Sequence, residues 1–229
     1  MTAVHKFESR GVIILFYPMN LDLTGRRCIV VGGGKVAERK VLGLLQAAGK
    51  VTLIAPKLTE RLLELAHAGL VDWYELRYMK GMLKDMKPLL VFCATDNRDV
   101  NEQAAEEARE EGALVNDVTE PEQTDFTVPS SFRRGDLLVT LSTEGVSPAF
   151  SRALRRELEQ EFPESFGPWL ERLKEMRAEM KEKLSSSDER QDFWRQALSP
   201  RVLDLVRCGE LEQAEAEIRN AITDVGAES

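Results

Sequence analysis

Three consecutive glycines, Gly32, Gly33 and Gly34, restrict the fold of this 229-residue chain more than any other feature. They directly follow the apolar residues 28–31 and precede a stretch in which apolar residues recur at helical spacing from Val36 onward. This order predicts a buried strand, a tight turn and a helix, the first crossover of a parallel sheet. Glycines also serve ordinary turns, so the run alone is compatible with a purely structural role.

The same residues fit the turn that holds the diphosphate of a dinucleotide. In such a turn Gly32 would allow the sharp bend, Gly34 the close approach of backbone to phosphate, and Ala37 the packing of helix against strand. The start of the helix would add free N–H groups and the positive end of its dipole. The predicted cofactor loop comprises Gly32, Gly33, Gly34, Lys35, Val36 and Ala37.

Apolar runs alternate with amphipathic stretches through the first half of the chain. The runs begin near residues 28, 51, 71, 89 and 114, and helical patterns begin at Val36, Thr59 and Val100. This alternation predicts an α/β fold with a Rossmann-like parallel sheet. Residues 78–87, which Pro88 stops, predict one or two helical turns.

Beyond Asn116 the regular alternation of apolar runs and helical patterns ends. Strand-like runs at residues 126–128 and 137–141 lack intervening helices, and Ser147 with Pro148 predicts a helix start that runs to Pro163. After Pro168 only helical patterns follow, including a charged face at residues 171–183 with i,i+4 pairs and a helix capped by Asp188. We therefore expect a Rossmann domain at residues 1–117, a small α+β region at 118–162 and a helical C-terminal domain at 163–229.

Composition narrows the classes of partner. A hydrophobic content of 43% suits a packed core, and a formal net charge of −8 argues against nucleic acid as a partner. The three cysteines are far apart, which suits reduced thiols in a cytoplasm, and with two histidines they form no metal site. The apolar residues 12–16 are too short to span a membrane, and we expect an N-terminal extension that packs on the body.

Two further loops belong to the predicted cofactor edge of the sheet. After the second strand, Pro56, Lys57 and Leu58 stand where a ribose-binding acid is common. Lys57 could meet the 2′-phosphate of NADP, or lie in solvent while backbone groups hold the ribose of NAD. Thr95 follows the strand at residues 89–93 and would line the same edge, although it equally fits a helix cap.

An arginine-rich region in an acidic protein suggests an anionic ligand, because guanidinium groups match carboxylates and phosphates. The alternative is that these arginines pair with neighbouring acids on a solvated surface. The region contains Arg133, Arg134, Arg152, Arg155 and Arg156.

A third group of candidates lies where the fifth strand leaves the sheet. Asp117 or Glu120 could accept a proton from a ligand in the crevice at that edge. Each is equally explained as a turn residue, since Asp, Thr and Pro favour turns.

Taken together, these motifs resemble the precorrin-2 dehydrogenase and sirohydrochlorin ferrochelatase family of siroheme biosynthesis. The resemblance runs from about Tyr17 to about Leu158, with the motifs in the family's order and spacing. It is carried by Tyr17, Pro18, Leu21, Asp22, Leu23, Gly25, residues 32–40, Ala94, Thr95, Asp96, Asn116, Phe126, Val128, Pro129, Ser147 and Pro148.

The resemblance implies an NAD-dependent oxidation of precorrin-2 to sirohydrochlorin and, in bifunctional relatives, the insertion of ferrous iron. It favours NAD over NADP and gives the arginines a polycarboxylated tetrapyrrole to bind. It also implies a cytoplasmic homodimer with an intertwined dimerisation region at about residues 118–150. The substrate-binding residues would be Arg133, Arg134, Ser147 and Arg152.

One position departs from the family pattern. The family reads Asn-Val-x-Asp-x-Pro after the fifth strand, whereas this chain has Thr119 in place of that aspartate. Asp117 lies two residues away, which in extended backbone is the same face, so it could substitute as the catalytic group. A threonine cannot act as a base at neutral pH, so metal insertion is harder to support than hydride transfer.

Two other functions fit the same residues. An NAD-sensing regulatory module would bind NAD and signal through the helical tail without binding a tetrapyrrole. A tetrapyrrole chelatase or carrier without a redox role would act without NAD.

Overall fold

The chain forms two compact units in a computed structural model that describes residues 16–184 and 186–227. The first unit ends at Val128 and the second begins at Pro129. Apart from Phe16, the predicted N-terminal extension lies outside the described residues. The predicted limits at 117/118 and 162/163 differ from this single boundary, and a separate domain at residues 118–162 stays a prediction.

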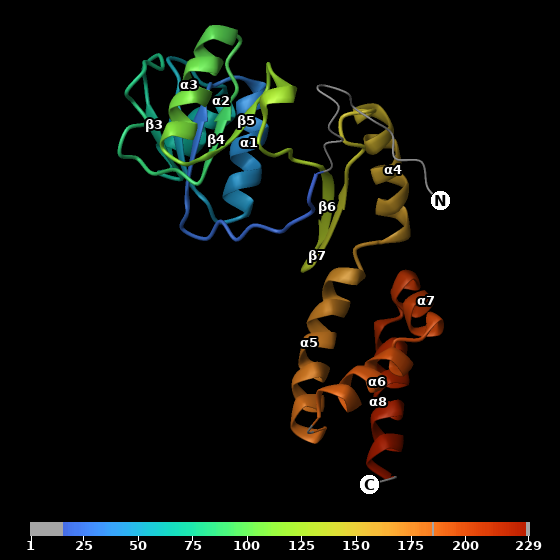
Figure 1. Ribbon diagram of the computed structural model, residues 1–229. Helices are drawn as coiled ribbons and strands as arrows, with labels where there is room; N and C mark the ends of the chain where they lie inside the picture. The colour runs from blue at the N-terminus through green and yellow to red at the C-terminus, as the bar shows by residue number, and fades with distance from the viewer. Residues whose placement is uncertain (1–15, 185, 228–229) are drawn as a thin grey trace, which may run out of the picture. The chain divides into compact units, whose positions relative to one another are not determined.

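Five parallel strands form the sheet of the first unit (Figure 1), which confirms the predicted α/β, Rossmann-like class. Its order is β3-β2-β1-β4-β5. The chain therefore reverses direction across the sheet between β1 and β4, and open α/β sheets bind ligands at the carboxyl ends of strands at such a switch point. The strands are β1 (Arg27–Val31), β2 (Lys50–Ile54), β3 (Val71–Tyr74), β4 (Leu90–Cys93) and β5 (Leu114–Asp117).

Helices cover both faces of this sheet. On one face α1 (Lys35–Gln46) and α2 (Glu60–His67) pack on strand residues that include Val30. On the other face α3 (Arg98–Glu110) packs through its alanines on residues that include Ile29. Full burial of each large aliphatic side chain contributes about 1.5–3 kcal/mol, and burial on both faces explains why the strands are continuous apolar runs.

The segment between β3 and β4 does not form the predicted helical turns. Gly81, Asp85 and Lys87 have φ angles of +98°, +63° and +49°, which a right-handed helix excludes. The prediction was wrong because the alternative, a series of turns, is stabilised by a residue far along the chain.

That residue is Glu107 of α3, which is only 4% exposed. Its carboxylate accepts hydrogen bonds from the N–H of Gly81 (2.9 Å), Leu83 (2.8 Å) and Lys84 (3.1 Å), and from the hydroxyl of Tyr78. Burial opposes ionisation of Glu107, yet these hydrogen bonds hold its pKa below the ordinary value. Glu107 therefore binds the segment to α3 as a buried, charged acceptor.

We expect Glu107→Gln to lower the free energy of unfolding by about 2 kcal/mol, because an amide leaves some of these donors unpaired. A lowered folded-state pKa means that the stabilisation is present above the ordinary glutamate pKa and is lost as pH falls through the folded pKa. Urea unfolding at neutral and acidic pH measures both effects. Glu110→Gln, on the exposed side of the same helix, is the control, and equal stability of wild type and Glu107→Gln at neutral pH would contradict the role.

The second unit begins with an antiparallel hairpin and continues with helices only (Figure 1). The predicted strand at residues 126–128 does not form, since the strand paired with β7 begins at Ser130. The unit contains β6 (Ser130–Arg134), β7 (Leu137–Leu141), α4 (Pro148–Glu161), α5 (Phe166–Lys183), α6 (Ser187–Ala197), α7 (Pro200–Cys208) and α8 (Leu211–Ala227).

Helix ends in this unit follow local capping chemistry. The Ser147 hydroxyl accepts a hydrogen bond from the N–H of Phe150 (3.2 Å), so α4 starts as predicted. Helix α6 is capped by Ser186, not by Asp188, because Ser186 and Glu189 form a reciprocal capping box. The apolar core of α5–α8 includes the buried residues Trp169, Met176, Met180, Val206 and Ile218.

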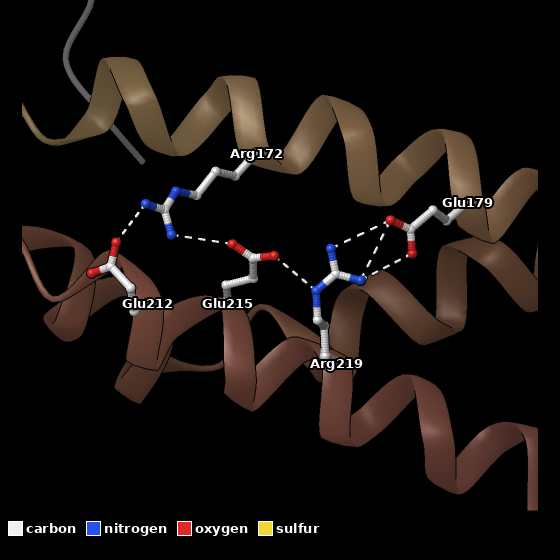
Figure 2. A network of polar contacts seen from close by, with 5 residues as sticks. All are labelled: Arg172, Glu179, Glu212, Glu215 and Arg219. Carbon is white, nitrogen blue, oxygen red and sulfur yellow. Dashed lines mark hydrogen bonds and ion pairs between the residues drawn. The ribbon is translucent and has the colours of Figure 1, made fainter.

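Charged residues join α5 to α8 in a chain of ion pairs (Figure 2). Arg172 of α5 bonds Glu212 (2.6 Å) and Glu215 (3.1 Å) of α8, and Glu215 also bonds Arg219 (2.7 Å). Arg219 reaches back to Glu179 of α5 at 3.0 Å. Arg172 and Glu179 of α5 therefore pair with residues of α8, whereas the sequence predicted i,i+4 pairs along residues 171–183 of α5 itself. Single exposed pairs contribute about 0–1 kcal/mol, so the shared geometry matters more than any one pair.

Within the described residues, no helix is long and apolar enough to cross a membrane. The described His, Cys, Asp and Glu side chains also form no group of three or more that could hold a metal ion.

Candidate cofactor and catalytic site

The glycine turn after β1 is packed against two other loops. A Cβ atom on Gly32 would lie 2.4 Å from the carbonyl oxygen of Ala94, and one on Gly33 only 2.0 Å from that of Lys57. Gly32 also has a φ of +130°, which L side chains rarely adopt. Both positions thus require glycine for packing. The strict requirement at Gly33, the middle residue of the motif, was not among the roles predicted from the sequence.

Gly34 and the start of α1 have the opposite character. No atom lies within 4 Å of a Cβ built on Gly34, and its φ of −86° and ψ of −172° are ordinary extended backbone. The N–H groups of Lys35, Val36 and Ala37 have no acceptor among the described residues, because no helical turn precedes them. Open space beside free N–H groups at a helix start is what an anionic diphosphate requires, so these residues fit a dinucleotide.

The loop after β2 lies beside this turn. The N–H of Thr59 donates to the carbonyl oxygen of Gly33 (3.0 Å), which ties the two loops together. Pro56 and Lys57 are exposed and Leu58 is half-buried. The Thr59 hydroxyl donates to the carboxylate of Glu38 in α1 (2.5 Å), and this hydrogen bond is the main cause of a lowered Glu38 pKa. Glu38 thus places an ionised carboxylate beside the loop that lacks the usual acid.

Thr95, at the end of β4, is held by a residue that sequence reasoning missed. The side chain of Asn101, fully buried in the first turn of α3, accepts hydrogen bonds from the N–H (3.0 Å) and hydroxyl (2.6 Å) of Thr95. It also donates to the Thr95 carbonyl oxygen (3.2 Å) and to the Thr119 hydroxyl oxygen (3.4 Å). The sequence signal for Asn101 is a polar residue at helical spacing from the alanines that form the buried face of α3.

Asp117 and Thr119, the predicted catalytic pair, are in direct contact. Oδ1 of Asp117 accepts hydrogen bonds from the N–H (2.8 Å) and the hydroxyl (2.7 Å) of Thr119. Asp117 is the last residue of β5 and is only 5% exposed. The carboxylate therefore lies two residues before the family position, with the threonine that replaces the family aspartate as its partner.

Asp117 borders a small hollow of about 30 Å³, enough for roughly one water molecule. Its neighbour across the sheet is Cys93 of β4. Burial, and then the charge of Asp117, raise the pKa of the Cys93 thiol to about 12, so this thiol stays protonated and is no nucleophile. The hollow is lined by Glu102, Ala105, Glu106, Arg109, Asp117, Glu120 and Gln123.

Arg134, one of the predicted substrate ligands, has a structural role in the second unit. Its Nε donates to the carbonyl oxygen of Phe162 (2.9 Å) and its Nη2 to that of Glu159 (3.3 Å), both at the C-terminal end of α4. Its Nη1 pairs with Glu164 at 3.2 Å, and its side chain is only 14% exposed. All three guanidinium nitrogens are thus engaged, and a substrate role for Arg134 has little support.

The other predicted substrate ligands are accessible. Arg133 and Arg152 are exposed, and neither guanidinium has a partner among the residues that the structure describes. Ser147 is half-buried and caps α4. Arg155 pairs with Glu159 at 2.5 Å, so for this arginine the structure shows pairing with a neighbouring acid, the alternative to binding an anionic ligand.

Comparisons with known proteins agree with this architecture. Residues 19–130 match a family model described as putative NAD(P)-binding, and residues 165–222 match one described as the sirohaem synthase dimerisation region. The second match covers α5 to most of α8 and lies beyond residues 118–150, where the resemblance placed the dimer contacts.

Individual relatives extend the match. The siroheme synthases of Photorhabdus laumondii and Nitrosococcus oceani are each 34% identical over 207 residues, covering 90% of this chain and 44% of the relative. The chain thus spans less than half the length of these curated relatives. A solved structure titled SirC, precorrin-2 dehydrogenase, shares the fold with a TM-score of 0.72 at 24% identity, over 90% of this chain and 100% of that one. The chain is thus similar to siroheme synthases along 90% of its own length, matches the model of their dimerisation region at residues 165–222, and shares its fold with a precorrin-2 dehydrogenase.

Proposed function

We propose that this protein oxidises precorrin-2 to sirohydrochlorin with NAD as the hydride acceptor. The observation that carries the proposal is the pairing, in one unit, of a dinucleotide turn with free N–H groups and a buried carboxylate at the same strand edge. Similarity to the proteins named above supports the substrate class, because they are siroheme synthases and a precorrin-2 dehydrogenase.

Residues at the carboxyl edge of the sheet would hold the cofactor. The N–H groups of Gly33, Gly34, Lys35, Val36 and Ala37 would face the diphosphate, with Gly32 allowing the turn. When bound, NAD supplies a hydride acceptor, and the protein's part is binding and orientation.

The adenosine ribose would lie beside Pro56, Lys57 and Leu58, with Thr95 lining the edge above β4. The Glu38 carboxylate, which pairs with Lys35 at 3.2 Å, lies beside this loop and would accept hydrogen bonds from the ribose hydroxyls of NAD.

The remaining roles follow from charge and position. Oxidation of precorrin-2 removes one hydride and one proton, and the Asp117 carboxylate would accept the proton while Thr119 orients it. Arg133 and Arg152 would engage substrate carboxylates, and Ser147 at the start of α4 would be a further ligand. Iron insertion is not part of the proposal, since a threonine hydroxyl stands at the family's acidic position.

The protein would act as a homodimer in the cytoplasm. The match of residues 165–222 to a dimerisation region supports the assembly. Buried free thiols at Cys28 and Cys93 support a reducing compartment.

Incubation of the purified protein with precorrin-2 and NAD tests the proposal. We expect one NADH for each sirohydrochlorin formed, followed by the absorbance of both products. Tight NAD binding without turnover would instead favour an NAD sensor, and metal insertion without NAD would favour a chelatase.

A further inference from the structure

We propose that Asn101 positions the Asp117 carboxylate by coupling it to the Thr95 loop at the cofactor edge. The catalytic meaning of this inference rests on the proposed function, whereas its geometry rests on contacts within the first unit. Asn101 is fully buried, so each of its polar atoms must find a partner inside the protein.

The amide group of Asn101 uses all four of its hydrogen-bonding positions. Its Oδ1 accepts from the N–H and hydroxyl of Thr95, and its Nδ2 donates to the Thr95 carbonyl oxygen and the Thr119 hydroxyl oxygen. A backbone N–H can only donate, so the contact with the Thr95 N–H determines which side of the amide carries oxygen. The Nδ2 atom is therefore the one that faces Thr119.

The direction of the next link follows from the charge of Asp117. An ionised carboxylate only accepts, so the single proton of the Thr119 hydroxyl goes to Oδ1 of Asp117 at 2.7 Å. The hydroxyl oxygen is left as an acceptor for Asn101. The hydrogen bond from Asn101 to the Thr119 hydroxyl, at 3.4 Å, is the longest in this series of hydrogen bonds, and the coupling of Asn101 to Asp117 depends on it.

At its other end, this series of hydrogen bonds reaches the Thr95 loop, which packs against the glycine turn. A Cβ on Gly32 would lie 3.1 Å from the Thr95 nitrogen and 2.4 Å from the Ala94 oxygen, so turn and loop pack without spare room. A line of contacts thus runs from Gly32 through Thr95, Asn101 and Thr119 to Asp117. Because misplacement of a reacting group by about 1 Å can cost roughly 100-fold in rate, loss of one link has a measurable effect.

Asn101→Asp is the sharpest single change, because the carboxylate keeps both acceptor contacts to Thr95 but can donate neither to the Thr95 carbonyl oxygen nor to the Thr119 hydroxyl. We expect kcat with precorrin-2 and NAD to fall about tenfold, while the NAD dissociation constant measured by calorimetry changes less than about threefold. Gln103→Glu makes the same amide-to-carboxylate change on the exposed side of α3 and should leave both values unchanged. An unaltered kcat in Asn101→Asp would overturn the inference.

A second substitution tests whether Asn101 acts through Thr119. Thr119→Val removes the hydroxyl at similar volume and should lower kcat by about the same factor, while Thr119→Ser should retain most of the activity. The double variant should lose no more than either single variant, because both break one chain. A multiplied loss of about 100-fold would show two independent roles and overturn the coupling.

Amide hydrogen exchange gives a readout that needs no turnover. The Thr119 N–H donates to Asp117, and in Asn101→Asp we expect it to exchange about tenfold faster. The Val115 N–H, which donates to Asp125 (2.8 Å), should be unchanged. Unchanged exchange at Thr119 would overturn the positioning role. If exchange at Thr119 is faster in Asn101→Asp but the wild-type protein does not oxidise precorrin-2, the positioning role stands and only the proposed function is refuted.

Discussion

Gly33→Ala is expected to abolish NAD binding and to lower the free energy of unfolding by about 3 kcal/mol or more. The added methyl group would lie 2.0 Å from the carbonyl oxygen of Lys57, and a backbone atom cannot rotate away. The hydrogen bond from the Thr59 N–H to the Gly33 carbonyl (3.0 Å) would be strained by the same displacement. The glycine turn and the loop after β2 would separate, and the predicted cofactor edge would lose its shape.

Gly34→Ala is the matched variant, because the same change one residue later meets open space. We expect its free energy of unfolding to stay within about 0.5 kcal/mol of wild type, since its backbone angles suit any residue. Its NAD dissociation constant should rise at least about tenfold, because the methyl group would occupy the space through which the diphosphate approaches. Urea unfolding and calorimetry on both variants separate folding from binding. Normal NAD affinity in Gly34→Ala would refute the placement of the diphosphate.

Asp117→Asn is expected to lower the rate of precorrin-2 oxidation by at least about 100-fold, the range typical of a lost general base. The amide is close to isosteric, so the contact with Thr119 can persist and the fold should be kept. NAD affinity should change little, because the change lies at the end of β5 and not at the glycine turn. Single-turnover kinetics at saturating NAD measure the chemical step directly.

Glu122→Gln controls for loss of a negative charge nearby, since Glu122 is exposed in the short 3₁₀ helix at Pro121–Gln123. It should oxidise precorrin-2 at the wild-type rate. If Asp117→Asn also keeps the wild-type rate, the carboxylate has no part in proton removal and another acceptor must be sought.

Much of the first unit could be predicted from the sequence because its signals are local. Apolar runs bounded by turn residues predicted the positions of the five strands of this unit, and the glycine turn lies at the edge predicted to bind the cofactor. Residues 78–87 could not be predicted in this way, since their turns depend on the carboxylate of Glu107, about 25 residues further along the chain. Local propensity favoured a helix there, and a tertiary contact overrode it.

The candidate site shows the same division. The residues of the dinucleotide turn carry a recognisable spacing, whereas the need for glycine at position 33 arises from a loop that begins after another strand. Two other features of the site were not predicted, the buried amide of Asn101 and the binding of Arg134 to carbonyl groups at the end of α4. A buried amide and an arginine that binds helix carbonyls look in sequence like ordinary polar residues, and only the packed structure shows that Arg134 has its donors engaged.

The proposed diphosphate site is tested most directly by following the backbone amides of the glycine turn while NAD is added to the wild-type protein. We expect saturable shifts in the amide resonances of Gly33, Gly34, Lys35, Val36 and Ala37, because these N–H groups would donate hydrogen bonds to the diphosphate. Shifts confined to other parts of the chain, or no shifts at millimolar NAD, would contradict it.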